Sequence, residues 1–122
     1  MDAAEPGQPP VAALGGVRRA LDIVAKAGLP AVVSSALDTS VGIRAGLALA
    51  AALPHLPYAC GLGTVSLFES DITTDPLVAD DGAIRLRDVS ADAGLLERYA
   101  ASPERRDWWL ARLRRVHALT AP

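Results

Sequence analysis

Apolar positions recur at spacings of three and four from Gly16 onward, which is the period of an amphipathic helix. The stripe consists of Val17, Ala20, Leu21, Val24 and Ala25. A glycine at position 28 and a proline at position 30 follow the last apolar position, and both are typical of a helix end. The pattern predicts a helix that begins near Gly16 and ends at Gly28.

Two short apolar runs flank a longer one. Residues 31–35, "AVVSS", do not alternate with polar residues, which is typical of a strand buried on both faces. Residues 58–60, "YAC", have the same character. Between them, residues 41–53 form a helical run in which only Arg44 is charged, so this helix must be covered on most sides. Helix, strand, helix and strand with tight loops predict a parallel α/β arrangement.

The loop before the second helix is polar. Its candidate N-caps are Asp38, Thr39 and Ser40, because short side chains with an oxygen atom accept hydrogen bonds from the first free amides of a helix. Asp38 is expected to be structural, as a cap or a loop anchor, since one carboxylate without partners makes a poor magnesium site.

The second half of the chain breaks this rhythm. Residues 65–75 predict at most a short helical turn, and Asp81 followed by Gly82 predicts a hairpin turn. Residues 95–99 suggest one helix. Ser102 and Pro103 supply an N-cap and a first-turn proline for a last helix through Leu119.

Composition limits the classes of function. A chain of 122 residues is expected to form one domain, and 12 basic against 14 acidic residues give no attraction to nucleic acid or anionic membranes. Cys60 is the only cysteine, which excludes an intramolecular disulfide. The proline-rich start lacks a secretory signal, and the longest apolar stretch, residues 45–53, is too short to span a bilayer. We therefore expect a cytoplasmic protein.

Residues 14–64 resemble the C-terminal part of o-succinylbenzoate synthase, a family of the enolase superfamily in menaquinone biosynthesis. The most specific piece is "SSALDTSVGI", followed about twenty residues later by "YACGLGT". The tail, "ERRDWWLARLRRVHAL", is similar to the end of the actinobacterial form.

The resemblance implies a C-terminal fragment of an enolase-superfamily (β/α)8 barrel, an α/β fold, with a helical tail. Residues 31–35 would be the seventh barrel strand and residues 58–60 the eighth. The expected organisation is an irregular proline-rich start (1–13), a partial barrel (14–64) and a return segment with hairpin and helices (65–122). A whole barrel needs about 250 residues, so we expect a truncated chain.

In the family, a succinyl-hydroxycyclohexadiene carboxylate loses water to give 2-succinylbenzoate. A lysine takes the proton beside the carboxylate, and Mg²⁺ held by three carboxylates stabilises the enediolate. The strands that carry these groups have no match here, and the position of the family's second lysine falls near Pro9 and Pro10. Lys26 lies a full helix away. The resemblance therefore assigns no catalytic residue and no metal ligand to this chain, and it assigns Mg²⁺ to the intact enzyme.

Three positions match residues that face the substrate in the family. These are Ser34 and Ser35 at the end of the seventh strand, and Gly61 after the eighth. Without the resemblance, the two serines would be ordinary polar residues at a strand end. His55 and His117 are expected to face solvent or to act as cap residues. Cys60 is expected to be a small buried hydrophobic residue.

Three hypotheses follow. The chain is an o-succinylbenzoate synthase by descent, a magnesium-dependent lyase truncated to inactivity, or half of a split enzyme that a second chain completes. The third is a small non-catalytic interaction module. The implied ligand of the intact family is a small-molecule carboxylate, with neither nucleic acid nor membrane as partner. Since two strands cannot close a barrel, the isolated chain is expected to aggregate or to be partly molten.

Overall fold

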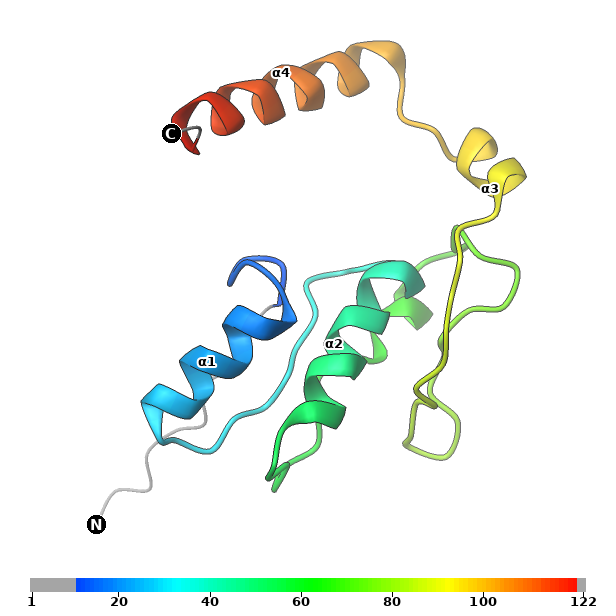
Figure 1. Ribbon diagram of the computed structural model, residues 1–122. Helices are drawn as coiled ribbons and strands as arrows, with labels where there is room; N and C mark the ends of the chain where they lie inside the picture. The colour runs from blue at the N-terminus through cyan, green and yellow to red at the C-terminus, as the bar shows by residue number, and fades with distance from the viewer. Residues whose placement is uncertain (1–10, 121–122) are drawn as a thin grey trace.

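The computed structural model describes residues 11–120, so most of the predicted irregular start, residues 1–10, lies outside the described part. The described part is built from helices joined by extended segments (Figure 1). In chain order these are α1 (Val17–Ala27), α2 (Ser40–Ala52), the 3₁₀ helix η1 (Gly63–Leu67), α3 (Ala93–Arg98) and α4 (Pro103–Thr120). The predicted helices are all present at their expected places.

One hydrophobic core holds the first half together. Helices α1 and α2 pack side by side, and the extended segment 31–35 runs beside them (Figure 1). Ala20 of α1, Ile43 and Leu49 of α2 and Val33 of the segment are almost fully buried. The remaining core residues are Val11, Ala31, Leu47, Leu53, Leu62, Val65 and Leu77. Because Leu77 belongs to this cluster, the segment after η1 folds back onto α2.

Helix α1 ends as the sequence predicts. Gly28 adopts the left-handed conformation at φ 62°, and its amide donates to the carbonyl of Val24 at 3.2 Å. A glycine in this conformation satisfies an otherwise free carbonyl of the last turn. The chain then turns directly into the buried segment 31–35.

The two predicted strands are not formed as strands in the described residues. Segments 31–35 and 58–60 are extended but meet only through one parallel bridge, between Ser34 and Gly61. The amide of Gly61 donates to the carbonyl of Val33 at 2.9 Å, and the amide of Ser35 donates to the carbonyl of Gly61 at 3.0 Å. A strand requires paired backbone hydrogen bonds over several residues, and these two bonds form a single bridge. The described fold is thus helical with one parallel bridge, and the barrel geometry is not confirmed by it.

The hairpin turn is present, without strands. Asp80 and Ala83 exchange both backbone hydrogen bonds, at 2.8 and 3.0 Å. Asp81 and Gly82 between them have φ values of 47° and 75°, as a two-residue turn with both central residues left-handed requires. The ladder stops after this single antiparallel bridge.

Helices α3 and α4 have side-chain caps. The carboxylate of Asp92 accepts from the amide of Leu95 at 2.9 Å, and the hydroxyl of Ser102 accepts from the amide of Arg105 at 3.3 Å. The cap at Ser102 was predicted, whereas the cap at Asp92 was not. No residue of α4 is buried.

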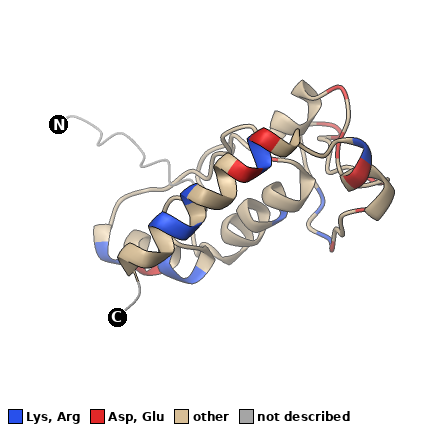
Figure 2. Ribbon diagram, turned by 90° about the horizontal axis from the view of Figure 1, so that it is seen from above, with Lys and Arg blue, Asp and Glu red and all other residues tan. Residues whose placement is uncertain are grey.

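The helices differ in charge. Charged residues lie along α1, α3 and α4, whereas Arg44 is the only charged residue of α2 (Figure 2). Helix α4 nevertheless exposes a large apolar surface, formed by Trp108, Trp109, Leu113, Val116 and Leu119. In the described residues, no helix combines the length and the apolar character needed to cross a membrane.

We predict that the 122-residue chain by itself exposes enough apolar surface to bind the dye ANS and to self-associate. Exposed side chains such as Leu67, Trp109 and Leu119 have no cover in the described fold. Dye fluorescence and size-exclusion chromatography at several concentrations measure this. A monodisperse monomer with a cooperative thermal transition and no dye binding would contradict it.

Candidate functional site

Ser34 and Gly61 lie side by side at the parallel bridge. Ser34 is half-buried and Gly61 is exposed. A Cβ atom added at Gly61 would lie 3.5 Å from Cβ of Ser34, which is ordinary contact. The glycine is therefore not required by space inside the chain. Its effect is to leave the backbone open beside the Ser34 side chain.

Ser35 is held by two polar contacts. Its hydroxyl donates to the carbonyl of Gly61 at 3.0 Å and lies 2.8 Å from the hydroxyl of Thr64. Together with the backbone bond from the Ser35 amide, these contacts fix the end of segment 31–35 to the start of η1. Thr64 is a partner that the sequence analysis missed, although it lies only three residues after Gly61 in "GLGT".

The loop after Ser35 is strained. Leu37 has φ 61°, a conformation that costs a residue with a Cβ roughly 1–2 kcal/mol. Leu37 as a whole is 58% exposed, so packing of this residue does not compensate for the strain. The carboxylate of Asp38 accepts from the amide of Ala36 at 3.3 Å, which closes a short turn around Leu37. Strain of this kind persists only where the surrounding structure imposes it.

Asp38 anchors this loop, and it does not cap α2. The N-cap residue is Thr39, and its side chain makes no capping hydrogen bond. Asp38 lies against Gly42, where an added Cβ would come within 2.8 Å of Cβ of Asp38. The predicted position of the helix start is right, but side-chain capping by this polar cluster is wrong because another carboxylate occupies that place.

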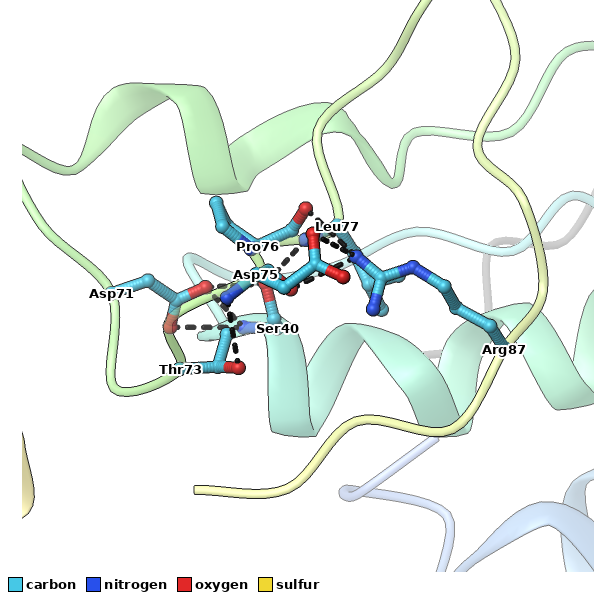
Figure 3. A network of polar contacts seen from close by, with 7 residues as sticks. All are labelled: Ser40, Asp71, Thr73, Asp75, Pro76, Leu77 and Arg87. Atoms are coloured by element: carbon cyan, nitrogen blue, oxygen red, sulfur yellow. Dashed lines mark hydrogen bonds and ion pairs between the residues drawn. The ribbon is translucent and has the colours of Figure 1, made fainter. Parts of the chain in front are cut away.

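That carboxylate belongs to Asp71, which contacts Ser40 although it lies 31 residues after it in the chain (Figure 3). Its two oxygens lie 3.3 and 3.1 Å from the amide nitrogen of Ser40, and one of them also accepts from the Ser40 hydroxyl. The Ser40 hydroxyl in turn accepts from the amide of Leu77 at 2.8 Å. Ser40 is fully buried and its bond with Leu77 lies away from solvent, whereas the bonds to the half-buried Asp71 are partly shielded. We call these three residues the Ser40 clasp.

Further contacts hold the segment that carries Asp71 and Leu77, and Figure 3 shows those made by Arg87. The amide of Ile72 donates to the Asp71 carboxylate at 2.7 Å. The guanidinium of Arg87 donates to the carbonyls of Asp75 and Pro76 at 2.9 and 3.2 Å, and it pairs with the Asp75 carboxylate at 2.9 Å. The Asp75 side chain is 77% exposed, so this ion pair contributes at most about 1 kcal/mol. The buried hydroxyl is the stronger restraint.

The other chemically interesting residues do not join this site. His55 and His117 are exposed, as predicted, and Lys26 is exposed in the last turn of α1. Cys60 is half-buried and packs against the core. Across residues 11–120, no three His, Cys, Asp or Glu side chains gather as metal ligands would. These residues therefore do not fit a magnesium site.

Solved structures place the fold in a class. The structure of a probable mandelate racemase from Alicyclobacillus acidocaldarius matches 78% of this chain with a TM-score of 0.65 and 30% sequence identity. The match covers 27% of that protein. The structural relative is a member of the enolase superfamily. No protein-family model matches the chain.

Curated relatives are more specific. The o-succinylbenzoate synthase of Mycobacterium tuberculosis strain H37Rv is 47% identical over 112 residues, or 92% of this chain. The enzyme of the same name from Mycobacterium ulcerans is 49% identical over 109 residues. The matches cover 34% and 33% of those proteins, so the chain spans about a third of their length. The chain is thus a homologue of the o-succinylbenzoate synthases over this region, and the resemblance in its sequence is confirmed.

We predict that Ser40→Ala loosens the segment that carries Asp71. The substitution leaves the buried amide of Leu77 without its partner, which costs about 1–3 kcal/mol, or a roughly 5- to 150-fold larger open population. Limited proteolysis between residues 65 and 80 measures this. Ser66→Ala is the matched control, because the exposed Ser66 hydroxyl only donates to the carbonyl of Gly63 within its own turn. Equal cleavage rates in the two variants would contradict the prediction.

Proposed function

We propose that this chain supplies one wall of the substrate pocket in an o-succinylbenzoate synthase, with Ser34, Ser35 and Gly61 on the substrate side. In this proposal, residues 31–35 and 58–60 are the seventh and eighth strands of a (β/α)8 barrel. The observation that carries it is the parallel bridge between Ser34 and Gly61. Neighbouring barrel strands are parallel, and barrel active sites lie at the carboxyl ends of the strands, which is where this proposal puts the three residues.

The three residues have different tasks. Ser35 is already bonded to Gly61 and Thr64, so it orients the strand end. Ser34 offers the hydroxyl that hydrogen-bonds an oxygen of the carboxylate substrate. Gly61 lets the backbone approach the substrate because it has no side chain on this exposed side. Together they bind and orient the substrate, and none of them takes the reacting proton.

The proton-abstracting base and the metal ligands come from polypeptide that corresponds to the remaining two thirds of the relatives' length. Lys26 is the only lysine, and it is exposed in the last turn of α1. In an intact enzyme of the family, Mg²⁺ would supply charge neutralisation, and we assign it no ligand from this chain. The partners in this proposal are the small-molecule carboxylate and the polypeptide that completes the barrel.

We predict that the 122-residue chain dehydrates the succinyl-hydroxycyclohexadiene carboxylate only after it is combined with the missing part of a relative. The complement is the N-terminal two thirds of the M. tuberculosis enzyme. The part of that enzyme that the chain replaces is 47% identical to the chain. The complement is either mixed with the chain or fused to it, and the complete protein is called the hybrid enzyme below. Formation of 2-succinylbenzoate in the presence of Mg²⁺ is followed spectroscopically.

The complement without the chain is the negative control, and the whole M. tuberculosis enzyme is the positive control. Turnover by the chain with no complement would overturn the assignment of the base and the metal to other polypeptide. An inactive hybrid that is folded by circular dichroism would overturn the proposed function itself.

We predict that Ser34→Ala in the hybrid enzyme raises KM by about 10- to 150-fold, because a hydrogen bond to a charged carboxylate contributes about 1.5–3 kcal/mol. Ser66→Ala is the matched control and leaves KM unchanged. Steady-state kinetics of both variants measure the effect. An unaltered KM in Ser34→Ala would remove Ser34 from the substrate wall.

A further inference from the structure

We infer that Asp71 is a positioning residue for this substrate wall: through Ser40 it fixes the loop that follows Ser34 and Ser35. The inference rests on the proposed function for what the loop serves. The contacts that support it are all within the described residues.

The loop has two fixed ends. At one end, the Ser35 amide and hydroxyl are bonded to the carbonyl of Gly61. At the other end, the Ser40 amide and hydroxyl are bonded to the carboxylate of Asp71. Only residues 36–39 lie between these anchors. A span of four residues transmits a displacement at one end to the other.

The span is also strained, which makes the anchors necessary. Leu37 is held at φ 61° with its side chain mostly in solvent, so the loop relaxes when one end is released. The bond between Asp38 and the Ala36 amide closes the turn locally, but at 3.3 Å to an exposed amide it is the weakest of these contacts. The Ser40 residue is fully buried and its bonds to Asp71 are partly shielded from solvent, so this end is the firmer anchor.

The negative charge of Asp71 matters as well as its shape. Helix α2 has no acidic residue in its first turn and no capping bond from its own N-cap side chain. The carboxylate of Asp71 accepts from the first amide of this helix and opposes the positive end of its dipole. An asparagine at this position retains the size and one acceptor oxygen, but it loses the charge and the second acceptor.

Asp71→Asn therefore tests whether Asp71 positions the loop, because the substitution keeps the size of the side chain. Asp75→Asn is its matched control. Asp75 lies four residues further along the same segment, and its carboxylate is paired with Arg87 at the surface. Amide hydrogen exchange is measured on the full 122-residue chain and on the hybrid enzyme. We expect Asp71→Asn to accelerate exchange at both the Ser40 and the Ser35 amides by about tenfold, and Asp75→Asn to change neither.

The exchange result decides the inference whether or not the hybrid enzyme is active. Acceleration at Ser40 but not at Ser35 would make Asp71 a local helix cap and overturn positioning. Rapid exchange at both amides in the unsubstituted protein would overturn it too. An inactive hybrid with the expected exchange pattern would remove the proposed function and leave the mechanical link from Asp71 to Ser35 standing.

Kinetics of the active hybrid add a second test. Asp71→Asn is expected to raise KM about as much as Ser34→Ala does, with a smaller change in kcat. In a variant that already carries Ser34→Ala, Asp71→Asn is expected to add little, because the two substitutions act on the same contact with the substrate. Independent, additive effects on KM would overturn the inference.

Discussion

The described structure depends on a buried hydroxyl. Ser40 lies where the polar loop ends and α2 begins, and it is bonded to two points of the later segment, Asp71 and Leu77. The other links between the two halves are apolar contacts such as that of Leu77, and solvent-exposed polar ones such as the ion pair of Arg44 with Asp88. Apolar contacts are not directional, whereas the hydroxyl fixes both position and register. The loop that carries the candidate substrate residues takes its shape from that fixed point.

Local signals in the sequence predicted most of the helices. The helix end at Gly28, the turn at Asp81 and Gly82, and the N-cap at Ser102 follow from conformational preferences within a few residues, and the structure has all three. The predicted strands failed for the opposite reason. An extended segment becomes a strand only through partners distant in sequence, and segments 31–35 and 58–60 share a single bridge.

The candidate site shows the same division. The resemblance selected Ser34, Ser35 and Gly61, and the fold brings all three together at the bridge. The supporting residues escaped prediction because nothing in their own neighbourhood marks them. Asp71 caps a helix 31 residues before it, and the polar cluster at Asp38 and Thr39 gave a sufficient local explanation for the same helix start. A long-range cap becomes visible only with coordinates.

Both tryptophans lie next to each other on α4, with ring centres 4.8 Å apart, and the Arg112 guanidinium lies within about 6 Å of each ring. They are half-exposed, and the core of α1 and α2 contains no tryptophan. Tryptophan fluorescence of this protein consequently reports on the surroundings of its last helix and does not report on the core. A blue shift of the emission on addition of another polypeptide would mark the moment at which α4 becomes covered.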